Sequence, residues 1–226
     1  MNLSSLLAAR TAMEKPIRVG LIGAGKFGSM VLAQAKHIPG YQIVGVADLD
    51  TDKARASLAR TGWEAENYNA RSMKQAVTEG TTCVTTDAAD LFACDAIECI
   101  IEATGHPLAG LRHGLASIDA GKHMIMANVE ADVLCGSVLA DRARTQGVVY
   151  SMAYGDQPAA MCELVDWVHN CGFELVSAGK GMNFAPPYRY STPDTVWDFF
   201  GWSAEEVAAG DFNPKMYNSF TDGTKV

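Results

Sequence analysis

The chain has 226 residues, 48% of them hydrophobic and 19% charged, which is typical of a globular protein that buries a sizeable core. This length suits one large domain or one and a half small ones. The formal net charge is −8 and the sequence contains no basic run, which argues against nucleic acid or an anionic membrane surface as a partner. We therefore expect small-molecule partners.

The N-terminal segment, residues 1–15, has apolar side chains at helical spacing over residues 2–13, which predicts a short helix rather than a signal peptide. No stretch approaches the ~20 apolar residues that span a bilayer. The six cysteines show neither a C-x-x-C pair nor zinc-ligand spacing, and we interpret them as buried thiols in a reducing compartment. These features predict a cytoplasmic protein.

A glycine-rich turn follows the first apolar run. Pro16 leads into a predicted buried strand, and Gly23, Gly25 and Gly28 then take G-x-G-x-x-G spacing before a helical pattern over Met30–Ile38. The first glycine permits a tight turn, the second lets a phosphate approach the backbone, and the third lets helix and strand pack closely. A pyrophosphate would bind at the positive end of the helix. The predicted cofactor-binding residues are Gly23, Ala24, Gly25, Lys26, Phe27 and Gly28.

A second apolar run, residues 42–47, ends at Asp48, twenty residues after Gly28. A carboxylate at this place accepts hydrogen bonds from a ribose hydroxyl of a dinucleotide. Asp48 favours NAD because it would repel the 2′-phosphate of NADP, whereas Lys53 and Arg55 could neutralise that phosphate. We therefore predict a dinucleotide-binding domain that uses NADP or NAD, and these residues leave both cofactors open. The alternative is a tight strand-to-helix turn without a ligand.

Strand and helix patterns alternate along the chain as far as residue 170. Strands are predicted around Val84 and over residues 96–103, 122–127 and 148–153, and helices over residues 52–60, 87–92, 108–120, 131–146 and 159–170. The segment 61–80 is polar and shows no clear period. This alternation predicts an α/β fold with a doubly wound Rossmann-type parallel sheet, forming a dinucleotide-binding domain over residues 16–157.

Loops that follow predicted strands should meet at one edge of the sheet, together with the glycine loop. Thr104 and Gly105 are predicted to lie beside the nicotinamide ribose, and Asn128 and Glu130 nearer to the ring. Such polar residues also favour helix caps and turns, which is the alternative interpretation for each of them. His106 is either a general acid or base or, at least as often in such a sequence, a turn residue.

The composition of the sequence changes beyond residue 172. Residues 173–183 predict a strand of a second domain, and residues 184–226 hold ten of the nineteen aromatic residues among short polar turns. A core of that aromatic density needs a partner surface. We therefore expect residues 158–226 to be the beginning of an α+β catalytic domain that is truncated.

With these motifs in view, the chain resembles the homoserine dehydrogenase-like oxidoreductases, and is most similar to their 1-deoxyxylulose-5-phosphate reductoisomerase-like branch, which carries an SAF-type domain after the catalytic one. The resemblance covers almost the whole chain and rests on the motifs Val19–Gly28, Glu102–Pro107, Gly121–His123 with Ala127–Glu130, Gly179–Asn183 and Asp222–Lys225. Homoserine dehydrogenases have Asn-Lys where this chain has Asn128 and Val129, and Glu130 follows instead of the lysine. This departure moves the expected substrate away from homoserine.

The resemblance implies an NAD(P)-dependent oxidoreductase that moves a hydride between nicotinamide and a small carbonyl or alcohol. Its sharper form is the reduction and rearrangement of 1-deoxyxylulose 5-phosphate in isoprenoid-precursor synthesis. The alternatives are a homoserine dehydrogenase proper and a non-catalytic dinucleotide-binding regulatory protein, because a fold alone never proves chemistry. We also expect a homo-oligomer.

Hydride transfer to a carbonyl builds charge on its oxygen, so the site needs a proton donor or a cation close to that oxygen. Lys180 or Lys225 is the predicted oxygen-stabilising cation, with Glu130 and Asp222 in supporting catalytic roles. Paired carboxylates of this kind suit Mg²⁺ or Mn²⁺ as a further cofactor. A phosphorylated substrate would call for cationic contacts from Lys180, Arg189 or Lys225. The alternative interpretation is that Lys180, Asp222 and Lys225 are solvated surface charges.

Overall fold

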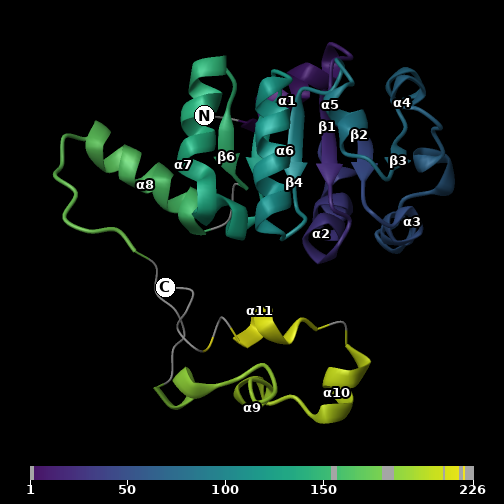
Figure 1. Ribbon diagram of the computed structural model, residues 1–226. Helices are drawn as coiled ribbons and strands as arrows, with labels where there is room; N and C mark the ends of the chain where they lie inside the picture. The colour runs from purple at the N-terminus through teal and green to yellow at the C-terminus, as the bar shows by residue number, and fades with distance from the viewer. Residues whose placement is uncertain (1–2, 154–156, 180–185, 211, 219–220, 222–226) are drawn as a thin grey trace. The chain divides into compact units, whose positions relative to one another are not determined.

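The computed structural model of the chain describes residues 3–153, 157–179, 186–210, 212–218 and 221 (Figure 1). The chain forms two compact units, Met1–Ala159 and Ala160–Val226, and each is described by itself. Among the described residues, no helix combines the length and the apolar character that crossing a membrane requires.

The first unit is built on a six-stranded sheet in which all neighbouring strands pair in parallel, in the order β3-β2-β1-β4-β5-β6. The strands are β1 (Ile17–Ile22), β2 (Tyr41–Ala47), β3 (Cys83–Thr85), β4 (Cys99–Glu102), β5 (His123–Met126) and β6 (Tyr150–Met152). The strand order reverses between β1 and β4, where Ile22 pairs with Glu102. The predicted doubly wound Rossmann-type sheet is confirmed. Sheets of this kind bind ligands at such a switch point, outside the carboxyl ends of the strands.

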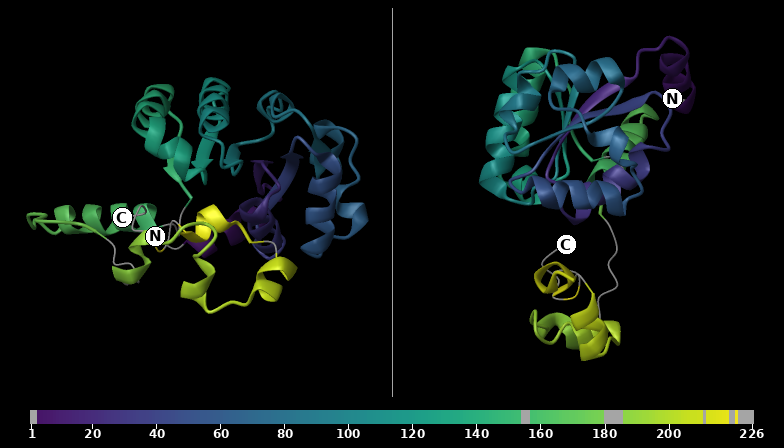
Figure 2. Two further views of the ribbon diagram at one scale, coloured as in Figure 1. Left: turned by 60° about the horizontal axis from the view of Figure 1, so that its bottom comes forward. Right: turned by 90° about the vertical axis from the view of Figure 1, so that its right-hand side faces the viewer.

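Helices cover both faces of the sheet (Figure 2). They are α1 (Leu3–Ala12), α2 (Lys26–Ala35), α3 (Thr51–Arg60), α4 (Met73–Glu79), α5 (Ala89–Phe92), α6 (Pro107–Asp119) and α7 (Val129–Gln146), with one 3-10 turn, η1 (Ala65–Tyr68). Leu32 of α2 and Leu58 of α3 are buried in one core cluster. Ile118 of α6 and Leu139 of α7 are buried in the other. Side chains alternate between the two faces of each strand, so the sheet contributes to both cores.

Two helix starts differ from the prediction at the carboxyl edge of the sheet. Helix α2 begins at Lys26 instead of Met30, because Gly25 is its N-cap. Helix α3 begins at Thr51 instead of residue 52, because the Asp50 carboxylate caps it by accepting hydrogen bonds from two backbone N–H groups of the first turn. Both differences bring a helix N-terminus close to the end of the preceding strand.

Helix α4 lies in the polar segment for which the sequence predicts no element. Ser72 caps it by accepting a hydrogen bond from a backbone N–H group, and Gly80 ends it in the left-handed conformation with φ of +71°. Ala76 is its one buried residue. Met73 and Val77 pack against the same core cluster as partly buried residues. These apolar residues span little more than one turn, so the two caps are the clearer signals of this helix in the sequence.

The described part of the second unit is helical. Its elements are α8 (Gln157–Asn170), η2 (Pro186–Tyr190), α9 (Trp197–Phe200), α10 (Ala204–Ala209) and α11 (Pro214–Asn218). The strand predicted over residues 173–183 is wrong for residues 173–179, and residues 180–183 lie outside the described residues. A single extended segment lacks the cross-strand neighbours that stabilise a sheet.

The aromatic side chains of the second unit pack against one another. Trp202 stacks on Phe212 with ring centroids 4.5 Å apart, and Tyr188 meets Phe199 edge to face at 4.3 Å. Offset and edge-to-face pairs of this kind stabilise a cluster beyond the area that they bury. The rings therefore supply one another with apolar surface.

All six cysteines are free thiols. Cys83 and Cys135 are buried, as predicted, and two others are half-buried. The prediction is wrong for Cys162 and Cys171, which are exposed. Cys162 lies on α8 and Cys171 directly follows it, and no described side chain of α8 is buried.

Candidate functional site

The glycine loop between β1 and α2 leaves the backbone of Gly25 open. A Cβ placed on Gly25 would meet no atom within 4 Å. Gly25 is also the N-cap of α2, and no side chain caps this end of the helix. A phosphate can therefore approach the positive end of the helix dipole without a steric barrier.

The fold itself requires the other two glycines of the loop. Gly23 has a left-handed φ of +94°, and a Cβ on it would lie 2.9 Å from the carbonyl group of Ala103. A Cβ on Gly28 would collide with the carbonyl oxygen of Gly23. Glycine at these positions lets the loop turn tightly beside the end of β4 and lets α2 pack against the loop.

Asp48 lies at the carboxyl end of β2 and is bonded to the glycine loop. Its Oδ2 accepts a hydrogen bond of 2.7 Å from the N–H of Ala24. Its Oδ1 accepts one of 3.0 Å from the N–H of Asp50. An ionised carboxylate has about four acceptor positions, so Asp48 can hold the loop and still accept hydrogen bonds from ribose hydroxyls.

Carboxylates and cations lie around the first turns of α3. Asp50 caps the helix, and Asp52 is exposed in its first turn. Lys53 is exposed as well. Nη1 of Arg55 donates a hydrogen bond of 3.1 Å to the carbonyl oxygen of Tyr68, so this guanidinium is engaged by the η1 turn. The surface beside Asp48 therefore carries more negative than positive side chains.

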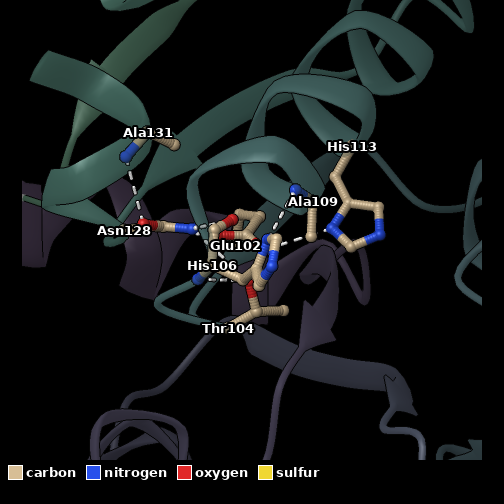
Figure 3. A network of polar contacts seen from close by, with 7 residues as sticks. All are labelled: Glu102, Thr104, His106, Ala109, His113, Asn128 and Ala131. Carbon is tan, nitrogen blue, oxygen red and sulfur yellow. Dashed lines mark hydrogen bonds and ion pairs between the residues drawn. The ribbon is translucent and has the colours of Figure 1, made fainter. Parts of the chain in front are cut away.

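A buried carboxylate lies at the end of β4, beside the switch point (Figure 3). The side chain of Glu102 is fully buried, and its Oε1 accepts a hydrogen bond of 2.5 Å from the hydroxyl of Thr104. The same Oε1 lies 3.1 Å from Nδ1 of His113 on α6. Oε2 has no hydrogen-bond partner among the described residues. Burying a carboxylate costs free energy, so the Thr104 hydroxyl and the His113 imidazole are the groups that offset this cost.

Asn128 uses both of its amide donors within the protein. Its Nδ2 donates to the carbonyl oxygen of His106 at 3.1 Å and to Oγ1 of Thr104 at 3.4 Å. Its Oδ1 accepts a hydrogen bond from the N–H of Ala131 and so caps α7. Asn128 is 1% exposed, and it joins the loop after β4 to the start of α7. It has no donor left to offer to a substrate.

The remaining polar residues of these loops have structural roles or point to solvent. His106 is the N-cap of α6, and its Nδ1 accepts a hydrogen bond of 3.3 Å from the N–H of Ala109. This geometry agrees with the turn interpretation of His106. Gly105 has φ of +69°, and a Cβ on it would meet no atom within 4 Å. Glu130 is exposed in the first turn of α7, where a carboxylate is favoured by the helix dipole.

Three of the four predicted catalytic residues, Lys180, Asp222 and Lys225, lie outside the described residues, so their roles stay predictions. Arg189, a candidate phosphate contact, is exposed in η2. Within the described ranges, no group of three or more His, Cys, Asp or Glu side chains could hold a metal ion. The site that the structure defines is therefore the group of loops at the carboxyl edge of the sheet beside the switch point, which we call the crevice because sheets of this kind bind ligands there.

Glu102 and His113 are the polar residues of this edge that our reasoning from the sequence did not single out as site residues. Glu102 is an acid at the end of a mostly apolar predicted strand, residues 96–103, and its place at the carboxyl end of that strand was the available signal. His113 lies on the next helix, eleven residues later. Nothing local in the sequence shows that its ring meets the strand end, because the contact depends on how α6 packs on the sheet.

Two family models match the chain. Residues 17–154 match the model described as "Oxidoreductase family, NAD-binding Rossmann fold". Residues 155–226 match the model described as "Oxidoreductase DRL, catalytic domain". The first match includes all six strands of the sheet and the glycine loop.

Curated relatives and solved structures give further matches. The chain is 30% identical over 129 residues to the 1-deoxy-D-xylulose 5-phosphate reductoisomerase of Pseudomonas putida, covering 57% of this chain and 28% of that protein. It is 36% identical over 73 residues to the enzyme of the same name from Ralstonia pickettii, covering 27% and 18%. The matches thus span less than a third of the length of these relatives. A homoserine dehydrogenase structure from Thiobacillus denitrificans is 24% identical, with a TM-score of 0.47, covering 61% of this chain and 29% of that chain.

Proposed function

Because the chain belongs to the oxidoreductase family with an NAD-binding Rossmann fold, we propose that it binds a nicotinamide dinucleotide at the carboxyl edge of the sheet and exchanges a hydride with a small carbonyl or alcohol. The observation that carries this proposal is the open backbone of Gly25 at the uncapped N-terminus of α2. The residues that would line the cofactor are Gly23, Ala24, Gly25, Lys26, Phe27, Gly28, Asp48, Thr104, Gly105 and Asn128. In this arrangement the glycine loop holds the pyrophosphate and Asp48 the ribose hydroxyls.

The charges beside Asp48 support NAD over NADP as the cofactor. A 2′-phosphate at this place would lie near the carboxylates of Asp48, Asp50 and Asp52. Arg55, which could have neutralised it, is bonded to a backbone carbonyl instead, and Lys53 is the cation that remains nearby. Repulsion between like charges outweighs one exposed lysine, because exposed ion pairs are worth little.

The chemistry needs positive charge or a proton donor at the substrate oxygen. The described crevice offers no amide donor for this purpose, because both donors of Asn128 are engaged. We therefore keep Lys180 or Lys225 as the proposed oxygen-stabilising cation, with Glu130 and Asp222 in support. Mg²⁺ or Mn²⁺ would need a ligand cluster, and the described residues supply none, so we derive no step through a metal.

The sharper form of the proposal is reduction with rearrangement of 1-deoxyxylulose 5-phosphate. It is supported by the motifs shared with the reductoisomerase-like branch and by the partial match to two reductoisomerases. Oxidation of homoserine is the second candidate, and the replacement of the expected lysine by Val129 argues against it. A regulatory protein that binds the dinucleotide without turnover is the third.

A binding and turnover experiment separates these possibilities. Titration with NADH and with NADPH, followed by cofactor fluorescence, measures the two dissociation constants. Turnover is followed at the nicotinamide absorbance with 1-deoxy-D-xylulose 5-phosphate and each reduced cofactor, and with L-homoserine and each oxidised cofactor. We expect NADH to bind more tightly, and 1-deoxy-D-xylulose 5-phosphate to be reduced. Binding without turnover of either compound would favour the regulatory protein, and absence of binding would refute the proposal.

A further inference from the structure

We propose that Thr104, Glu102 and His113 form a proton relay between the crevice and solvent beside α6 (Figure 3). This inference rests on the proposed function, because it gives the hydride-transfer site a route for the accompanying proton. Hydrogen bonds join all three side chains, and both bonds meet at Oε1 of Glu102.

The buried carboxylate at the centre is the first reason for the proposal. Glu102 is 0% exposed, and its second oxygen, Oε2, finds no partner within the described part of the chain. The two neighbouring strands end in Ile22 and Met126 at the same level of the sheet. An apolar residue would fill that place without a desolvation cost, so a carboxylate there indicates a role beyond packing.

The two ends of the chain of hydrogen bonds lie in different surroundings. Thr104 is at the crevice: a Cβ on Gly23 of the glycine loop would lie 3.1 Å from the backbone nitrogen of Thr104. The side chain of His113, on α6, is 22% exposed. The buried Glu102 therefore separates a residue at the proposed reaction site from a residue that can exchange protons with water.

Every proton is accounted for in the direction of carbonyl reduction. His113 takes a proton from water at Nε2 and passes its Nδ1 proton to Oε1 of Glu102. The Thr104 hydroxyl has two acceptor positions, which are occupied by the N–H of His106 at 3.3 Å and Nδ2 of Asn128 at 3.4 Å. The protonated Glu102 therefore donates to Oγ1 of Thr104 in place of the longer bond from Asn128, and the Thr104 hydroxyl turns to donate to the substrate oxygen. When the hydride reaches the carbonyl carbon, that oxygen takes the Thr104 proton, Thr104 takes the Glu102 proton, and Glu102 returns to a carboxylate. One proton from water ends on the product, and His113 is left with its proton on Nε2. His113 returns to the Nδ1–H form by exchanging protons with water before the next turnover.

Other titratable groups lie near this pair on α7 and β6. The hydroxyl of Tyr150 donates a hydrogen bond of 2.8 Å to Oδ1 of Asp132. Burial and the Asp132 carboxylate raise the pKa of Tyr150, and burial raises the pKa of Cys135, so both stay neutral near pH 7. Asp132 is therefore the acidic neighbour on α7 and β6. Two further titratable residues are close to His113 in the sequence: Arg112 on α6 and His106 in the loop before it.

The test compares turnover in the parent with three variants that keep side-chain size: Thr104→Val, Glu102→Gln and His113→Gln. The reaction is reduction of 1-deoxy-D-xylulose 5-phosphate or oxidation of L-homoserine, whichever the parent supports. We expect each variant to lower kcat by about a hundredfold, the lower end of what acid–base groups contribute, and we expect Glu102→Gln and His113→Gln to leave the cofactor affinity unchanged.

Added imidazole separates a relay from a purely structural role. In His113→Ala it should restore part of the rate, because imidazolium from solvent can donate a proton to Glu102, and it should not restore Glu102→Gln. The matched control is His37→Gln, which changes an exposed histidine elsewhere and should behave as the parent. Variants with parental kcat, or a loss of rate in His113→Ala that imidazole does not rescue, would overturn the relay alone. A parent that binds no dinucleotide, or that turns over neither compound, would overturn it through the proposed function.

Discussion

Replacing Gly25 with valine should abolish dinucleotide binding and leave the fold intact. Gly25 has φ of −69° and ψ of −157°, which is extended backbone that valine tolerates, and a Cβ there would meet no atom within 4 Å. The change costs the free protein about 1 kcal/mol or less at an N-cap, or a decrease of roughly 2–4 °C in Tm. The valine side chain would fill the space through which the pyrophosphate reaches the helix. We expect the Kd to rise by at least about a hundredfold, or ~2.7 kcal/mol.

Gly28→Ala is the matched opposite of this change. Its Cβ would collide with the carbonyl oxygen of Gly23, which belongs to the backbone and cannot rotate away. Overpacking costs about 1–3 kcal/mol, and a rigid neighbour places this case above the upper end before alanine regains about 1 kcal/mol of helix propensity. We expect a net loss of about 2 kcal/mol, or roughly 4–8 °C in Tm.

Thermal melting by circular dichroism and titration with NADH measure the two quantities for both variants. The structure predicts opposite effects of the two changes: Gly25→Val should lose NADH binding and keep most of its thermal stability, whereas the main effect of Gly28→Ala should be a lower Tm. If Gly25→Val bound NADH within about threefold of the parent, the glycine loop would be a structural turn and not a phosphate site. If Gly28→Ala melted with the parent, the packing argument would be wrong.

Three further outcomes follow from the site and the core. Asp48→Ser should weaken NADH binding and lower the ratio of the NADPH Kd to the NADH Kd, because a carboxylate that repels a 2′-phosphate is removed. Fluorescence titration measures both constants, and the same ratio in parent and variant would contradict this prediction. Lys122→Met should cost about 1–3 kcal/mol in urea unfolding with NADH affinity unchanged, because the buried Nζ donates to two backbone carbonyls at 2.7 and 2.9 Å. Iodoacetamide at pH 8 should label the exposed Cys162 and Cys171 first and Cys99 last, because burial raises the pKa of Cys99 to about 12. Mass spectrometry measures the order of labelling, and the reverse order would contradict this prediction.

The sheet could be predicted from the sequence because its signals are local. Each strand is a short apolar run, and the glycine spacing with Asp48 identifies the first βαβ unit before any tertiary contact is known. Helix α4 was not predicted because it is seven residues long and its apolar residues Met73, Ala76 and Val77 span little more than one turn. The failed strand over residues 173–179 shows the converse, since an apolar pattern cannot supply the neighbouring strand that it needs.

The candidate site was harder to predict because its polar contacts are long-range. The sequence placed Thr104 and Asn128 at the correct edge, but it could not show that they bond to each other across 24 positions. The sequence also could not show that the N–H of Ala24 donates a hydrogen bond to Asp48. This bond ties Asp48 to the glycine loop, whereas the sequence predicted only a contact between Asp48 and the ribose. Such pairings depend on the parallel register of the strands, which single-sequence patterns do not encode.

The polar side chains of the crevice are largely occupied by one another, and this limits what they can recognise. The Thr104 hydroxyl donates a hydrogen bond to Glu102, and the amide nitrogen of Asn128 donates to the carbonyl oxygen of His106 and to Thr104. A ligand therefore meets an uncapped helix N-terminus, the spare acceptor positions of Asp48 and an open backbone at Gly105. These groups suit a pyrophosphate and ribose hydroxyls, which every reaction of a nicotinamide dinucleotide has in common. None of them distinguishes one carbonyl compound from another, so substitutions in this crevice should change cofactor affinity and the shared proton step, and leave the order of preference among substrates unchanged.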